Sequence, residues 1–291
     1  MEFRDIVQLL VSGVTLGSIY AIIALGFTII YSVTGIINFA QGEFVMLGGM
    51  VTFFLLRAFA LPIWAALVLA VIVVALVGFL VERTAIRPAR QASVISLIII
   101  TIGVSIFLRG IAGQLWGRDA VPVPPFSGTE SIPFQGVYIF TQSLWVVGVT
   151  LVVMLALHFF LSYSVLGKAL RACAVNKRAV SLMGIDERKM AAISFSLSAA
   201  LGAVGGIIIA PLTMTSYDLG VMLGLKGFVA ASLGGFSSQL LAAAGGIGLG
   251  ILEALSAGLI SSAYKDATAL VVLLVVLFIR AGRLAESERS A

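Results

Sequence analysis

The side chains that could carry chemistry in this sequence are few, and the most unusual are charged residues inside long apolar runs. Glu43, Arg57, Arg109 and Glu253 each lie in such a run. A charge at the depth of a lipid bilayer costs about 2.5–3.5 kcal/mol on insertion scales, so each one needs a physical reason. Arg57 and Arg109 lie near the ends of their runs, where a long side chain can reach the headgroups. The two glutamates remain as candidate functional residues.

Glu253 lies about halfway along the apolar segment 241–263. On a helix it shares a face with Gly246 and Gly250. A face of small residues is expected to pack against protein, so Glu253 should point into a bundle. There it is either a structural buried polar group or part of a polar path, and the sequence leaves both open.

A second polar group lies in the segment 36–56. Asn38 and Gln41 are three residues apart and share a helical face, whereas Glu43 lies about 200° from Gln41 on an ideal helix. Irregular backbone at membrane depth is tolerated only where it is buried in protein or lines a cavity. We interpret the three residues as lining a substrate pathway or gate. A purely structural polar cluster is the alternative.

Motifs for catalysis or nucleotide binding are absent from the sequence. It contains no H-E-x-x-H, G-x-S-x-G or G-x-x-x-x-G-K-[ST] pattern. With one histidine, His158, and one cysteine, Cys173, it is poorly equipped for a metal site, and we expect none. His158 is interpreted as a packing residue. The chain is therefore not predicted to be an enzyme, and if ATP drives it, another chain hydrolyses the ATP.

The composition is that of a membrane protein. Hydrophobic residues make up 60% of the 291 residues, charged residues 11%, and the mean hydropathy is +1.16. Soluble domains contain about 25% charged residues, so a soluble enzyme or a disordered chain is excluded. The net charge of +5 suggests basic loops at a membrane rather than a nucleic-acid partner. We predict an all-α, polytopic helical bundle that forms a single domain over 1–291.

Nine segments are candidates for crossing the bilayer, because a helix needs about 20 apolar residues to do so. They are 6–31, 36–56, 61–81, 93–115, 139–161, 190–214, 219–236, 241–263 and 267–282. If 36–56 crosses fully, there are nine spans and the N-terminus is outside. If that segment is broken or re-entrant on the outer side, there are eight and the N-terminus is inside.

The loop charges predict an orientation. Loop 82–90 carries a net charge of +2 and loop 162–189 a net charge of +4, and the tail contains Arg280, Arg283 and Arg289. Loop 116–138 has a net charge of −1 and four prolines. Basic loops stay on the cytoplasmic side of a membrane. Loops 82–90 and 162–189 and the C-terminal tail are therefore expected in the cytoplasm, and loop 116–138 on the outside. The N-terminal residues sum to zero charge and give no orientation.

Glycines four residues apart recur along the chain. Such pairs let two helix backbones approach closely, so they predict a tightly packed bundle. The pairs are Gly13/Gly17, Gly202/Gly206, Gly220/Gly224 and Gly246/Gly250. The sequence Leu-Gly-Gly at 47–49 and again at 233–235 hints at an internal repeat.

The loop 162–189 is predicted to be structured. Asn176 can cap a short helix over 177–183, Gly184 suits a left-handed stop, and Asp186 can cap the next helix. Two short helices with small and apolar faces would project into the cytoplasm, a shape that suits docking on a soluble partner. A compact basic loop is the alternative, although it does not explain the Ala/Leu/Gly pattern.

At this loop the chain resembles the permease subunits of branched-chain amino-acid ABC importers, in the pattern G-K-A-L-R-A-x-A-x-N…A-x-x-L-M-G-I. Two further parts of the sequence are similar to the same family. One consists of residues 13–21 and 35–43, and the other is the glycine-rich stretch from 227 to 253. The length resembles that of the shorter of the two permeases that pair in such importers.

The resemblance implies a bacterial inner-membrane subunit that pairs with a second homologous permease. Two cytoplasmic ABC ATPases would bind ATP-Mg, and this chain would hold no cofactor. A periplasmic binding protein would deliver a branched-chain or related neutral amino acid. Relatives that carry urea or short amides give one alternative, and an ion-coupled secondary carrier another.

The residues expected to meet the ATPase lie between 167 and 185. Small residues would allow the ATPase to approach closely, and apolar residues would be buried in its surface. Arg171 would meet acidic residues at the rim of the contact. Lys177 is expected to matter little. The predicted coupling residues are Gly167, Lys168, Ala169, Arg171, Ala172, Asn176, Leu182, Gly184 and Ile185.

Overall fold

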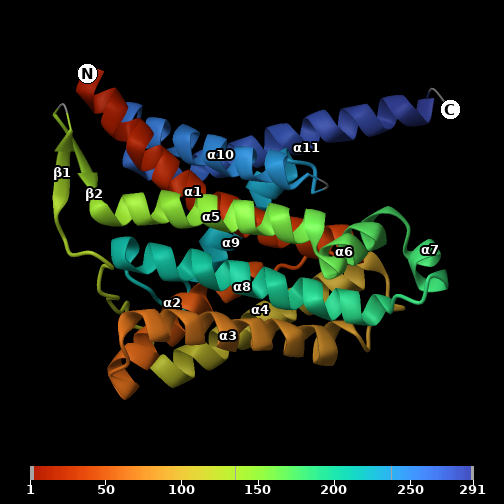
Figure 1. The fold of residues 1–291 in the computed structure, drawn as a ribbon. Coiled ribbons are helices and arrows are strands. Elements are labelled where there is room, and N and C mark those ends of the chain that lie inside the picture. The colour runs from red at the N-terminus through yellow and green to blue at the C-terminus, as the bar shows by residue number, and fades with distance from the viewer. Residues whose placement is uncertain (1–2, 135, 237, 290–291) are drawn as a thin grey trace.

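The computed structural model describes residues 3–134, 136–236 and 238–289, which form a bundle of long helices running in alternating directions (Figure 1). In chain order the elements are α1 (Phe3–Thr34), α2 (Gln41–Phe59), α3 (Ile63–Val81), the π-helical turn η1 (Glu82–Ile86), α4 (Val94–Trp116), β1 (Ser131–Phe134), β2 (Val137–Phe140), α5 (Thr141–Tyr163), α6 (Val165–Val175), α7 (Lys177–Leu182), α8 (Glu187–Thr213), α9 (Leu219–Leu233), α10 (Gln239–Leu259), the 3₁₀ turn η2 (Ser262–Tyr264) and α11 (Lys265–Arg289).

The predicted all-helical membrane bundle is confirmed. Each of the nine predicted segments corresponds to one helix, namely α1, α2, α3, α4, α5, α8, α9, α10 and α11. Within the described residues, seven helices are long and apolar enough to cross a membrane, and α9 is a shorter apolar helix. One feature was not predicted: β1 and β2 form an antiparallel hairpin in which Ser131 pairs with Phe140.

The two ends of the bundle differ. We call the end with β1 and β2 the hairpin end, and the end with α6 and α7 the basic end (Figure 1). Arg90 lies 3.8 Å from Glu187 at the start of α8, so loop 82–90 belongs to the basic end. The C-terminal part of α11 extends toward the same end in Figure 1. The side chains of Arg280, Arg283 and Arg289 lie outside the described part of the structure.

The N-terminus, which the charges did not place, lies at the hairpin end. The Gln8 Nε2 donates to the Tyr138 carbonyl at 3.0 Å, and the Tyr138 N–H donates to Gln8 Oε1 at 2.9 Å. The start of α1 therefore lies on the side of loop 116–138.

The four glycine pairs hold the helices together as predicted. A methyl group at any of the eight glycines would come within 3.0 Å of a neighbouring helix. Gly17 and Gly250 bring the backbones of α1 and α10 together, while Gly206 packs against the Val45 carbonyl of α2. These close contacts leave α1, α2 and α8 mostly buried, whereas α3, α4 and α5 expose most of their surface.

The segment 36–56 crosses the bundle, but its first residues are not helical. The chain turns at Gly35, whose φ is +76°, and becomes regular only at Gln41. Gln41 contacts Ser198, near the middle of α8, so α2 begins at about half depth. Helix α9 also begins there, because Gly220 and Gly224 pack against Gly42. From this point α2 runs to the hairpin end and α9 to the basic end.

The bundle has two halves with matching packing. In the first, α1 lies against α9 and α10; in the second, α8 lies against α2 and α3. Helix α2 also contacts α4, just as α9 contacts α11. Because α1 and α8 run in opposite directions, the halves are inverted relative to each other, an arrangement typical of membrane transporters. The two Leu-Gly-Gly sequences lie in the corresponding helices α2 and α9 and the turn after α9.

Candidate functional site

Gln41 joins three helices at the start of α2. Its Nε2 donates to the Ser198 carbonyl of α8 at 3.1 Å. The Ser198 hydroxyl lies 2.6 Å from Gln41 Oε1 and 2.8 Å from the Gly26 carbonyl of α1. Both ends of the buried amide are therefore satisfied by neighbouring helices. The Gln41 side chain thus links the start of α2 to α1 and α8.

Glu43 points away from Gln41, toward α4 and α9. The Ser105 hydroxyl of α4 donates to Glu43 Oε1 at 2.8 Å. A methyl group at Gly220 would lie 2.9 Å from Glu43 Oε2, which places that oxygen at the start of α9. Oε2 is buried and has no hydrogen-bond partner among the described residues. An oxygen in this position is available to a cationic or hydrogen-bonding ligand.

Asn38 lies in the irregular stretch before α2. Its Oδ1 accepts a hydrogen bond from the Ala40 N–H at 3.1 Å. Its Nδ2 is buried, and no described residue accepts a hydrogen bond from it. The structure thus separates the predicted cluster by function: Gln41 is fully bonded, while Asn38 and Glu43 each keep one unpaired buried atom.

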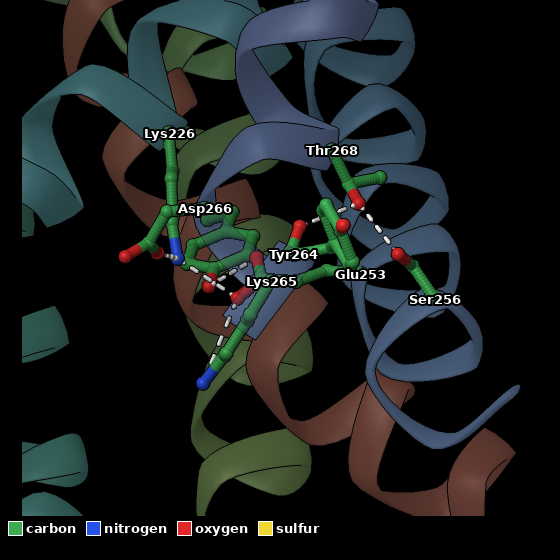
Figure 2. Close-up of polar contacts among 8 residues, drawn as sticks. Lys226, Glu253, Ser256, Tyr264, Lys265, Asp266 and Thr268 are labelled. Carbon is green, nitrogen blue, oxygen red and sulfur yellow. Dashed lines mark hydrogen bonds and ion pairs between the residues drawn. The ribbon is translucent and has the colours of Figure 1, made fainter. Parts of the chain in front are cut away.

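Glu253 belongs to a buried ion-pair network that Figure 2 shows. Its Oε1 lies 2.8 Å from Lys226 Nζ of α9, and its Oε2 accepts a hydrogen bond from the Tyr20 hydroxyl of α1 at 2.8 Å. The Glu253 side chain is 0% exposed and that of Lys226 only 7%. The carboxylate therefore ties α10 to both α1 and α9. A lysine inside the apolar segment 219–236 was the only sequence signal for this partner.

The network reaches the surface at the start of α11 (Figure 2). Asp266 Oδ1 lies 2.7 Å from Lys226 Nζ, and Lys265 Nζ lies 3.6 Å from Glu253 Oε1. Both α11 side chains are about half exposed, at 56% and 43%. Nearby, the Thr268 hydroxyl donates to Ser256 Oγ at 2.7 Å and joins α11 to α10. Lys226 is thus shared between the core and a peripheral helix.

The predicted caps of the 162–189 loop are confirmed. The Asn176 side chain accepts a hydrogen bond from the Ala179 N–H at 3.1 Å and begins α7. Gly184 has a φ of +81°. Asp186 accepts from the Arg188 N–H at 2.8 Å, which holds the pKa of that carboxyl below its usual value and keeps it charged at the start of α8.

The face of α6 that was expected to meet a partner is turned inward. Gly167 is buried, and a methyl group there would overlap the Phe160 carbonyl of α5. Ala169, Ala172 and Ile185 pack against the core beneath the helix. The small side chains of α6 allow it to pack closely against α5 and the core of the bundle. Of these four residues, Gly167 is buried and the other three are partly exposed.

The exposed surface of α6 and α7 has other members. Val175, Leu182 and Met183 are 88%, 89% and 78% exposed. Lys168, Arg171 and Gly184 are also exposed. Of the predicted apolar anchors, only Leu182 points outward, and sequence analysis missed Val175 and Met183.

Lys177, which was expected to matter little, has a specific contact with another helix. Its Nζ donates to the Thr34 carbonyl at the end of α1 at 2.7 Å. The next residue is Gly35, where the chain turns toward Asn38 and α2. A lysine ammonium satisfies the unpaired carbonyls at a helix C-terminus. Lys177 thereby connects α7 to the irregular stretch before α2.

Cofactor sites and reactive groups are scarce. Within the described residues, no three His, Cys, Asp or Glu side chains lie close enough to hold a metal ion. Cys173 is buried in α6, and burial raises the pKa of its thiol, so it is poorly reactive at neutral pH.

Comparison with known proteins identifies the family. The family model described as the permease component of branched-chain amino acid transport systems matches residues 9–279. The chain is 37% identical to the "High-affinity branched-chain amino acid transport system permease protein LivH" of Escherichia coli (strain K12), over 96% of this chain and 94% of the relative. It is 35% identical to the corresponding protein BraD of Pseudomonas aeruginosa, over 96% and 95% of the two chains. A probable branched-chain amino acid transport permease of Methanocaldococcus jannaschii is 29% identical, over 88% and 83%. The helical bundle and these full-length matches together show that the chain belongs to the family of branched-chain amino acid transport system permease components.

Proposed function

We propose that this chain forms, with a second homologous permease, the membrane path of an ATP-driven importer for branched-chain or related neutral amino acids. Two ABC ATPases bind at the basic end, and a periplasmic binding protein delivers substrate at the hairpin end. The family and the names of its relatives support this assignment. Because the three relatives compared here are all named for branched-chain amino acids, this substrate class is preferred over urea or short amides.

The observation that carries the proposal is the exposed tip of α6 and α7. Val175, Leu182 and Met183 expose their apolar side chains almost fully, beside basic residues at the end of the bundle. Two short capped helices hold these side chains in place, so the tip is a rigid apolar surface rather than a loose loop. Burying one such side chain in a partner contributes about 1.5–3 kcal/mol. We assign this tip as the contact with the ATPase.

The path itself is proposed to pass Asn38 and Glu43. An amino acid is a zwitterion, and its ammonium group suits the unpaired Glu43 Oε2. Its carboxylate suits the unpaired Asn38 Nδ2 and the N-terminal ends of α2 and α9, which meet beside these residues. Gln41 and Glu253 then position the helices around the path, because their polar atoms are already bonded.

The test is a pair of substitutions at Leu182. Leu182→Asp should remove the ATPase from the purified complex and abolish uptake, because it places a charge in an apolar contact. Leu182→Met keeps an apolar side chain and should preserve both. Unchanged ATPase association in Leu182→Asp, or uptake that needs an ion gradient but no ATP, would contradict the proposal.

A further inference from the structure

A cleft of about 700 Å³ lies near the basic end, between α1, α5, α6 and the start of α10. Part of its wall is apolar and includes the buried Leu25 together with Leu151 and Leu155, which are about half exposed. Its other lining residues include His158, Arg171 and Gln239. None of these residues belongs to the proposed amino-acid path around Glu43.

The cleft changes from apolar to polar along the helix axis. On α5, Leu151 and His158 are seven positions apart, which corresponds to about 10 Å toward the basic end. His158 is exposed in this cleft, so its interpretation as a packing residue is wrong. Arg171 follows on α6, still closer to that end.

The Arg171 guanidinium is free to bind a ligand. It has no ion-pair or hydrogen-bond partner among the residues that the structure describes, and it lines the cleft. Its contact with an acidic rim of an ATPase, which the sequence suggested, stays a prediction. An arginine here fits a phosphate group whose molecule also has an apolar part.

We propose that this cleft binds an anionic phospholipid of the leaflet at the basic end. One acyl chain would lie along Leu151 and Leu155, and the headgroup phosphate would meet Arg171 and His158. Basic pockets between membrane helices on the cytoplasmic side bind anionic headgroups in this way, and the volume is that of sites for molecules of moderate size. The inference rests on the proposed function only for the orientation of the basic end.

Native mass spectrometry of the intact complex, delipidated and then mixed with dioleoylphosphatidylglycerol or dioleoylphosphatidylcholine, tests the site. The wild type should retain the anionic lipid in preference to the zwitterionic one. Arg171→Gln should lower retention of the anionic lipid about fivefold, as expected for one basic contact at a membrane surface. Arg83→Gln removes an exposed arginine at the same end but outside the cleft, and should retain the lipid as the wild type does.

A second variant fills the cavity instead of changing its charge. Leu155 is half-exposed, so Leu155→Trp should fold, and it should exclude the lipid. Equal retention of both lipids, or retention unaffected by Arg171→Gln and Leu155→Trp, would overturn the proposal. Loss of a second permease from Leu155→Trp with unchanged lipid retention would instead make the cleft a protein interface. Because lipid retention requires neither ATP nor an amino-acid substrate, failure of the proposed function would be seen separately.

Discussion

Lys226 is the residue on which the polar core of this molecule depends. It lies between the buried Glu253 and the half-exposed Asp266, with Nζ 5.7 Å from the centre of the Tyr20 ring. A buried ion pair adds little net stability, because desolvation offsets the attraction. Removing one partner costs much more, because the other charge is left behind. The pair therefore fixes how α1, α9 and α10 fit together.

Glu253→Gln should destabilise the purified protein by about 1–3 kcal/mol. The loss is smaller than the full cost of a broken buried pair because Lys226 keeps Asp266. Transport should fall only in proportion to the protein that remains assembled. Thermal unfolding in detergent measures the effect. Asp266→Asn, at a more exposed site, should cost less than about 1 kcal/mol.

The double variant Lys226→Met/Glu253→Gln separates pairing from packing. It should be more stable than Glu253→Gln alone, because no buried charge remains and Asp266, which loses its partner, is half-exposed to solvent. Strictly additive losses would show that the two side chains do not act as a pair.

Glu43→Gln should leave assembly intact and reduce leucine uptake by about tenfold or more. The amide keeps the hydrogen bond from Ser105 but lacks the charge that the substrate ammonium would meet, a contact of about 1.5–3 kcal/mol. Uptake into vesicles that contain equal amounts of complex is the measurement. Ser105→Ala, which keeps the carboxylate, should have a smaller effect. Normal uptake by Glu43→Gln would show that Glu43 does not contact the substrate along the path.

At the scale of elements, signals local in sequence gave correct predictions. The apolar runs located nine helices, the four glycine pairs located close contacts between helices, and the caps at Asn176 and Asp186 were recognised from neighbouring residues. Contacts between distant segments could not be predicted. Lys177 meets Thr34, and Lys226 meets Glu253, through packing that no periodicity encodes. For the same reason the burial of Gly167 against α5 was not predicted.

The glycine contacts can be tested by adding bulk. Gly250→Val should prevent α10 from packing on α1, because its side chain would overlap the backbone of Gly17. Gly103→Val should be tolerated, since a methyl group at this position of α4 would have no neighbouring atom within 4 Å. The yield of monodisperse protein should fall severalfold only for Gly250→Val. Equal yields would contradict the assigned packing.

Lys177→Met tests the connection between α7 and α1. Loss of the hydrogen bond to the Thr34 carbonyl should weaken coupling, so that ATP is hydrolysed but severalfold less substrate is moved per ATP. ATPase association should persist, because the exposed tip at Leu182 is unchanged. Lys177→Arg can still donate to the carbonyl and should recover coupling. A normal ratio of transport to hydrolysis in Lys177→Met would rule out this role.

At the scale of the whole molecule, the two inverted halves explain why α2 and α9 begin together at half depth. Each of these two helices contacts a helix farther out through polar groups. Glu43 of α2 contacts Ser105 of α4, and Lys226 of α9 contacts Asp266 of α11. Helices α6 and α7 lie between the halves in sequence and at the basic end in space (Figure 1). A movement of α6 and α7 can thus reach the start of α2 through Lys177 and Thr34.

The most direct test of this account is leucine uptake into proteoliposomes that contain the purified complex, with ATP enclosed and the binding protein outside. The account predicts uptake that requires both ATP and the binding protein, that is lost in Leu182→Asp, and that is unaffected by an uncoupler. Uptake that proceeds without ATP and collapses with the uncoupler would contradict it, and would make the chain an ion-coupled carrier.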